Sequence, residues 1–108
     1  MGNENSIKLF EEKNVRTSWN DEEEKWYFSV VDIVEVLTGS VDYQTARKYW
    51  NKLKQRLREE GNESVTNCHQ LKLPASDGKY YKTDVADQAE MFRLKQEIIW
   101  RLNLEGVL

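Results

Sequence analysis

The chain has few of the residues that hold disulfide-rich or metal-binding proteins together. Its 108 residues include one cysteine, Cys68, and one histidine, His69. These counts exclude a disulfide framework and all but exclude a Cys/His metal site. No apolar run approaches the roughly 18–20 residues that span a bilayer, and the N-terminus lacks the apolar stretch of a signal peptide. We therefore expect a soluble, cytoplasmic globular domain without a metal, a cofactor or a membrane partner.

Signatures of catalysis are also missing from the sequence. His69 directly follows Cys68, and neighbouring side chains of a strand point to opposite faces, so the two cannot pair as nucleophile and base. The acidic pair Asp84 and Asp87 is expected at the start of a helix, where capping accounts for it. The sequence has no glycine-rich phosphate loop or dinucleotide-binding pattern. We therefore expect that this protein is not an enzyme.

The aromatic content indicates a folded domain despite a polar composition. Charged residues make up 32% of the chain and the mean hydropathy is −0.81, values that resemble those of disordered proteins. Disordered chains lack aromatic residues, however, and this chain has four Trp, five Tyr and three Phe. We expect one folded domain over residues 7–102, with a disordered N-terminus at 1–6 and a tail at 103–108.

The first half of the chain reads as a hairpin followed by two helices. Apolar, β-branched and aromatic residues alternate over 15–19 and 26–30, on either side of an acidic turn, and 7–10 is also strand-like. Ser29 and Asp32 fit a capping box for a helix that reaches Leu37, with Gly39 as its left-handed end.

The second half adds a longer helix, another hairpin and a final helix. Asp42 is the expected cap of a helix over 43–60. Two strands at 69–73 and 79–83 flank a turn that contains proline and glycine. Thr83 or Asp84 is expected to cap a last helix that ends near Leu102. Strands, two helices, strands and a helix in this order predict an α+β fold.

The charges are divided unevenly along the chain, although the net charge is only −3. Residues 1–40 carry four Lys/Arg and nine Asp/Glu, a net charge of −5. Residues 41–58 carry six Lys/Arg and one acid, a net charge of +5, and residues 59–108 carry six against nine, a net charge of −3. A strongly cationic segment inside an acidic protein is typical of a surface that binds a polyanion.

The helix expected over 43–60 contains this cationic segment. Its apolar residues recur at helical spacing and predict one buried stripe, Ala46, Trp50, Leu53 and Leu57. The other faces carry only cations and amides before Glu59, whereas an ordinary surface helix mixes charges of both signs. Lys and Arg neutralise phosphates, and Arg, Asn and Gln can make paired hydrogen bonds to base edges in the major groove. The candidate DNA-binding residues of this helix are Arg47, Lys48, Asn51, Lys52, Lys54, Gln55, Arg56 and Arg58.

The surroundings of this helix leave several interpretations open. A short helix, a turn and a longer basic helix follow helix-turn-helix order, although the turn is slightly long. The second hairpin adds Lys79 and Lys82 as candidate DNA contacts, together with Lys72. Lysines also protect exposed edge strands, and we expect at least one of Tyr80 and Tyr81 to lie in the core. The basic helix would alternatively contact an acidic protein, or be a solvated face without a partner.

Two blocks of the sequence resemble the N-terminal domain of the BRO family, which baculovirus BRO proteins share with phage and prophage antirepressors. Residues 26–37 (WYFSVVDIVEVL) are similar to the family's aromatic pair, short strand and V-x-D-V-x-x-x-L helix. Residues 71–83 (LKLPASDGKYYKT) resemble its second hairpin, and residues 90–95 resemble the start of its next helix. The resemblance implies an α+β domain that binds DNA or RNA in transcriptional or lysis–lysogeny control. It also allows a protein-interaction module, an antirepressor that binds a repressor protein without contacting DNA.

The sequence departs from this family in two places. Residues 38–41 (TGSV) stand where the family usually has G-Y, and the usual proline and F-x-x-W helix do not follow Lys95. We interpret residues 103–108 as the end of a truncated chain or of a shortened member that lacks the effector region.

The last helix is expected to have two apolar stripes, more than a lone domain of this size buries. The first stripe is Val85, Ala89, Phe92 and Ile99. The second is Met91, Leu94, Ile98 and Leu102. We expect the second stripe either to pack against a twin subunit, forming a homodimer, or to cover the sheet of its own chain.

Overall fold

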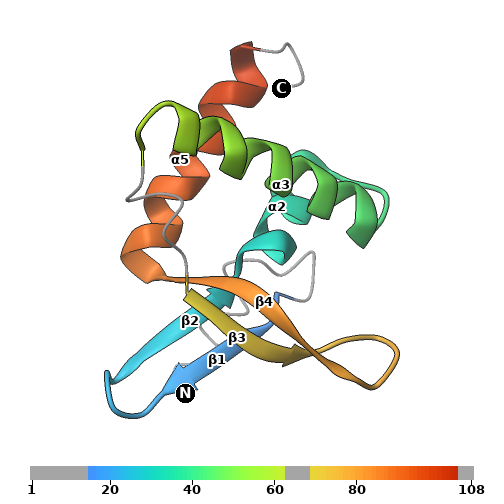
Figure 1. Cartoon of the computed structure of the whole chain (residues 1–108), viewed down its shortest axis with the longest axis vertical. Coiled ribbons are helices and arrows are strands. Elements are labelled where there is room, and N and C mark those ends of the chain that lie inside the picture. Colours follow the sequence, from blue (N-terminus) through green and yellow to red (C-terminus); the bar gives the residue numbers. More distant parts are fainter. Residues whose placement is uncertain (1–14, 63–68, 105–108) are drawn as a thin grey trace.

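A computed structural model describes residues 15–62 and 69–104 of the chain (Figure 1). The strand-like stretch at 7–10, the N-terminus at 1–6, Cys68 and the last four residues of the tail lie outside the described residues. The α+β fold and the expected order of elements are confirmed. They are β1 (Thr17–Asn20), β2 (Lys25–Ser29), α2 (Val30–Thr38), α3 (Tyr43–Glu59), β3 (His69–Pro74), β4 (Tyr80–Asp87) and α5 (Gln88–Leu104).

The four strands form one antiparallel sheet in the order β1-β2-β4-β3. Both hairpins predicted from alternation are present, and β4 joins them by pairing with β2 as well as β3. The two hairpin turns project from opposite ends of the sheet, and the three helices lie together on one side of it (Figure 1). The turn between β3 and β4 therefore extends beyond the helices on the side where α3 begins.

The predicted helix ends are largely confirmed. The Ser29 hydroxyl accepts a hydrogen bond from the Asp32 amide, and Gly39 ends α2 with a left-handed φ of 65°. The Asp42 carboxylate accepts from the Thr45 amide at 2.8 Å and caps α3. The capping box is only half formed, because the Asp32 carboxylate accepts from the Arg16 amide and guanidinium instead of returning to the amide of Ser29.

The core lies between the sheet and the helices. As predicted, Ala46, Trp50, Leu53 and Leu57 of α3 are all buried, in one cluster with side chains of α2, α5, β2 and β4. A smaller cluster of Tyr27, Leu73 and Val85 forms the other face of the sheet, since neighbours along a strand alternate between faces. The basic helix α3 is thus held by its apolar stripe, and its remaining sides are exposed.

The expected start of the last helix is wrong by several residues. β4 continues to Asp87, because its last three residues pair with β2, the final two of them beyond the residues that pair with β3. Asp87 then starts α5: its carboxylate accepts from the Glu90 amide at 2.9 Å, and the Glu90 carboxylate accepts from the Asp87 amide at 3.2 Å. This reciprocal pair is a capping box. Thr83 and Asp84 lie inside the strand, so Asp84 is free to contact α3.

Of the two places expected for the second apolar stripe of the last helix, the structure shows the one within its own chain and not the homodimer contact. Met91, Leu94, Ile98 and Leu102 are buried in the core of their own chain, because this side of α5 packs on α2 and the sheet. Of the other stripe, Val85 belongs to β4 and is buried, while Phe92 and Ile99 are exposed. The exposed apolar residues of α5 are Phe92, Ile99, Trp100 and Leu104.

Candidate nucleic-acid interface

The exposed side of α3 carries a concentration of cations without salt-bridge partners. Six Lys and Arg residues lie on this helix, and no carboxylate lies on it before Glu59. In the part of the chain that the structure describes, only one of the six, Lys54, forms a salt bridge. The five others are exposed and are called here the α3 cations: Arg47, Lys48, Lys52, Arg56 and Arg58.

Lys54 departs from the prediction, because it is bound to a carboxylate of the sheet. Its ammonium lies 2.7 Å from the Asp84 carboxylate and 5.8 Å from the centre of the Trp50 ring. The same carboxylate accepts from the indole N–H of Trp50 at 2.8 Å and from the side-chain amide of Gln70 at 2.9 Å. Lys54 thus anchors α3 to the sheet, and its charge is already balanced in the free protein.

The ionised form of Asp84 is favoured in this network. Burial alone would raise the pKa of Asp84, but the hydrogen bonds from Lys54, Gln70 and Trp50 outweigh it and hold this pKa below its ordinary value. Residues of α3, β3 and β4 meet at this one carboxylate, so it fixes how the helix lies over the second hairpin.

The second hairpin adds cations and exposed aromatic rings next to α3. Lys72 and Lys82 are direct cross-strand partners, an arrangement of like charges that destabilises an antiparallel pair. Lys79 is exposed in the turn before β4. Neither Tyr80 nor Tyr81 is in the core, contrary to expectation: 64% and 49% of their surfaces are exposed. Leu73, the cross-strand partner of Tyr81, is buried in the smaller core cluster instead.

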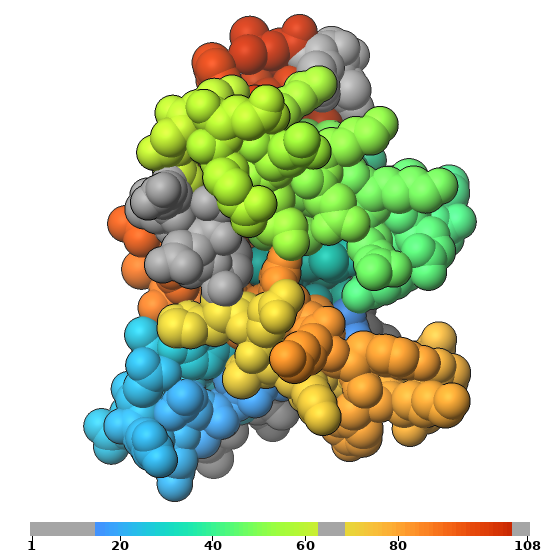
Figure 2. All heavy atoms as spheres, in the orientation of Figure 1, coloured from blue at the N-terminus to red at the C-terminus, as the bar shows by residue number. Residues whose placement is uncertain are grey.

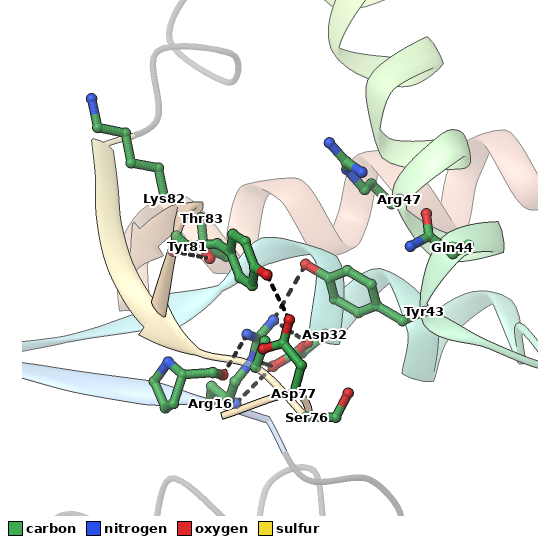
Figure 3. Close-up of a pocket in the computed structure, with 12 residues that line it drawn as sticks. Arg16, Asp32, Tyr43, Gln44, Arg47, Ser76, Asp77, Tyr81, Lys82 and Thr83 are labelled. Carbon is green, nitrogen blue, oxygen red and sulfur yellow. Dashed lines mark hydrogen bonds and ion pairs between the residues drawn. The ribbon is translucent and has the colours of Figure 1, made fainter. Parts of the chain in front are cut away.

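An open cleft of about 680 Å³ separates α3 from the turn of this hairpin. It is visible as the hollow between the green helix and the orange turn (Figure 2). Tyr43, Gln44 and Arg47 of α3 line one side, and the hairpin lines the other with residues that include Asp77, Tyr81 and Lys82. The hydroxyls of Tyr43 and Tyr81 point toward one another across the cleft, whereas Lys82 points away from both rings (Figure 3).

Arg16 fixes the floor of the cleft by joining four segments of the chain. Its guanidinium donates to both oxygens of Asp32 in α2, at 2.8 and 3.0 Å, and to the carbonyl of Pro74 in β3 at 3.0 Å. It also lies 5.4 Å from the centre of the Tyr43 ring. The bond to Asp32 raises the pKa of Arg16 above its ordinary value, so the charge on this floor is permanent and balanced. Both walls of the cleft are therefore held in position before any ligand arrives.

The predicted site residues lie on α3 and on the second hairpin, and two of them, Arg47 and Lys82, line this cleft. All except Lys54 are exposed. Arg47 of α3 and Lys82 of β4 line the cleft from opposite sides, so the two candidate regions are brought together. Spacing along the sequence did not reveal Arg16, Tyr43 or Asp77 as cleft residues, because they come from separate elements and only the fold brings them together. The run of two tyrosines and two lysines at 79–82 was the one local signal of this cleft in the sequence.

The described part of the chain offers no arrangement for a metal ion and no membrane-spanning helix. Within residues 15–62 and 69–104, no three His, Cys, Asp or Glu side chains gather closely enough to hold a metal. None of the helices described is long and apolar enough to cross a bilayer. Comparison of the chain with protein-family models, with curated proteins and with solved structures finds no significant match.

Proposed function

We propose that this chain is a DNA-binding domain of a phage- or prophage-type regulator or antirepressor of the BRO family, and that it binds duplex DNA through α3. The observation that carries the proposal is the set of α3 cations. Five exposed cations that form no salt bridge with any residue in 15–62 or 69–104 share one helix in a chain whose net charge is −3. Their mutual repulsion costs stability in the free protein, and a row of phosphates relieves it.

The chemistry of α3 suits a duplex in two respects. Its Lys and Arg side chains release counterions when they neutralise phosphates, which supplies sequence-independent affinity. Asn51 and Gln55 are exposed between these cations, and their amides match the hydrogen-bonding edge of adenine in the major groove. The order of α2, a turn over residues 39–42 and the basic helix α3 supports a helix-turn-helix mode, in which the second helix enters the groove. The regulatory role is supported by the resemblance of residues 26–37 and 71–83 to the BRO family.

Charge reversal on α3 tests the proposal. The triple variant Lys48→Glu, Lys52→Glu and Arg56→Glu should lose binding to a fluorescein-labelled, mixed-sequence duplex in an anisotropy titration at low salt. The single variants Arg56→Glu and Arg93→Glu form a matched pair, because each reverses one exposed arginine on a helix and each changes the net charge equally. Arg56→Glu should weaken binding clearly more than Arg93→Glu. Equal effects would mean that net charge alone governs the affinity and that α3 is not the binding surface.

A protein-interaction module is the second candidate, favoured by the exposed apolar side of α5. Trp100 and Phe92 are 55% and 62% exposed, and exposed aromatic residues are enriched where proteins bind one another. A repressor bound through α5 would stay bound to the triple α3 variant. Two results together would favour this second function: the wild-type chain does not bind DNA, and the triple variant still binds a repressor.

A further inference from the structure

The cleft between α3 and the second hairpin has the chemistry of a site for a nucleobase. Tyr43 and Tyr81 stand on its opposite sides with 37% and 49% of their surfaces exposed, although both are held in place. The Tyr43 hydroxyl accepts from Arg16 at 3.5 Å, and the Tyr81 hydroxyl donates to Asp77 at 2.5 Å. Aromatic rings that are exposed but already ordered lose little entropy when a ligand stacks on them.

The charges in the cleft distinguish a base from a phosphate. The Asp77 carboxylate accepts from Tyr81 and from the Lys79 amide, and these bonds hold its pKa below the ordinary value. An ionised carboxylate beside the tyrosines repels a phosphate but accepts hydrogen bonds from base amino groups. The unpaired cations lie at the rims, with Arg47 on the α3 side and Lys82 on the outer side of the hairpin (Figure 3). A base therefore fits inside the cleft, and its flanking phosphates fit outside.

The size and position of the cleft agree with this division. Its volume of about 680 Å³ lies within the range of about 300–1,000 Å³ that is common for small-molecule sites. Arg47 belongs both to the cleft and to the α3 cations, so a strand bound along α3 passes the mouth of the cleft. A base that is stacked and paired inside a duplex does not reach a recessed site. Only an extrahelical or unpaired base reaches the tyrosines.

We propose that this cleft takes an unpaired nucleobase adjoining a duplex that α3 holds, with the base against Tyr43 and Tyr81. The inference rests on the proposed function, since it needs nucleic acid on α3. It adds that the domain distinguishes perfectly paired DNA from DNA with an unpaired nucleotide.

The test compares a fully paired duplex with the same duplex carrying one bulged nucleotide, by anisotropy at fixed salt. Wild-type protein should bind the bulged duplex about tenfold more tightly, the effect of stacking one base on an aromatic side chain. Tyr43→Ala and Tyr81→Ala should each remove this preference without changing affinity for the paired duplex. Tyr81→Phe should keep most of it because the ring is retained. Phe92→Ala, which removes an exposed ring from α5, should leave both affinities unchanged.

The outcomes separate this inference from the proposed function. Equal affinity of wild-type protein for both duplexes would overturn the cleft inference and leave DNA binding by α3 in place. Loss of paired-duplex affinity in Tyr43→Ala, with melting unchanged, would also overturn it, because the ring would then act in duplex binding. A free deoxynucleoside monophosphate that binds as tightly as the bulged duplex would make the cleft a small-nucleotide site instead. Failure of both duplexes to bind at low salt would overturn both proposals.

Discussion

The lysines of the second hairpin give a quantitative prediction for DNA binding. Each protein cation that neutralises a phosphate of a duplex contributes about −0.9 to the slope of log K against log salt concentration. The five α3 cations alone predict a slope of about −4.5, which weakens binding about 500-fold between 50 and 200 mM salt. If Lys72, Lys79 and Lys82 also contact phosphates, the slope for eight contacts is about −7.

The perturbation is the triple variant Lys72→Gln, Lys79→Gln and Lys82→Gln. Lys72 and Lys79 are exposed, and Lys82 lies opposite Lys72 in the sheet. Removal of this like-charge pair should leave the fold intact or slightly stabilise it. The slope should become less steep, changing from about −7 in the wild type to about −4.5 in the variant. It is measured by anisotropy at five or more salt concentrations with one mixed-sequence duplex.

Two outcomes would contradict the predicted phosphate contacts. An unchanged slope in the variant, with wild type near −4.5, would place the hairpin away from the DNA and leave α3 as the only contact. A wild-type slope near zero would mean that no phosphates are neutralised and would refute the role of the α3 cations. Lys54→Gln is the internal comparison: because Asp84 already balances Lys54, its loss should change the slope by less than one contact.

The two carboxylate networks predict how stability responds to mutation and pH. Asp84→Asn should lower the free energy of unfolding by about 1–3 kcal/mol in urea denaturation, because Lys54 loses its charged partner. The pKa of Asp84 is below its unfolded value of 3.8, so its stabilisation is present above that pH and is lost as the pH falls through the lower, folded value. The wild type should therefore lose stability more steeply than Asp84→Asn below about pH 4, and parallel curves would contradict the network. Arg16→Ala should cost about 1–3 kcal/mol, because the buried Asp32 carboxylate would lose its guanidinium donors. A loss within measurement error would show that Arg16 is not needed to hold α2, α3 and β3 together. Leu57→Ala, with a fully buried side chain, should cost about 2–5 kcal/mol by the same assay and verify that α3 is docked as described.

The sequence predicted those parts of the fold that depend on local patterns. The apolar stripe of α3, the cap at Asp42 and the left-handed end at Gly39 each follow from residues within one or two helical turns. The hairpins follow from alternation on either side of a turn. These elements were identified because the physical cause and the signal occupy the same short segment.

The sequence misled where a tertiary contact competed with a local signal. Asp84 has the residue type of a helix cap, yet pairing of β4 with two neighbouring strands keeps it in the sheet. Asp32 occupies the capping-box position of α2, yet Arg16 takes its carboxylate from 16 residues away. In both cases an acidic side chain was assigned to the nearest amide, whereas the fold gave it to a distant cation. Arg16 supplies three N–H donors to the Asp32 carboxylate, whereas the capping box would supply one, so the distant partner is favoured.

The same two carboxylates explain why the candidate interface is a surface of fixed shape. Asp84 ties α3 to both strands of the second hairpin, and Asp32 holds Arg16 against the end of β3 and against Tyr43. Helix and hairpin are therefore connected at two points, one on each side of Arg47. Cations on the two elements keep a constant separation in the free protein, and binding of a rigid duplex then costs little conformational entropy. Asp84 and Asp32 therefore do not weaken the cationic surface, because Lys54 and Arg16 already balance their charges. Instead, these two ion pairs hold the α3 cations in position.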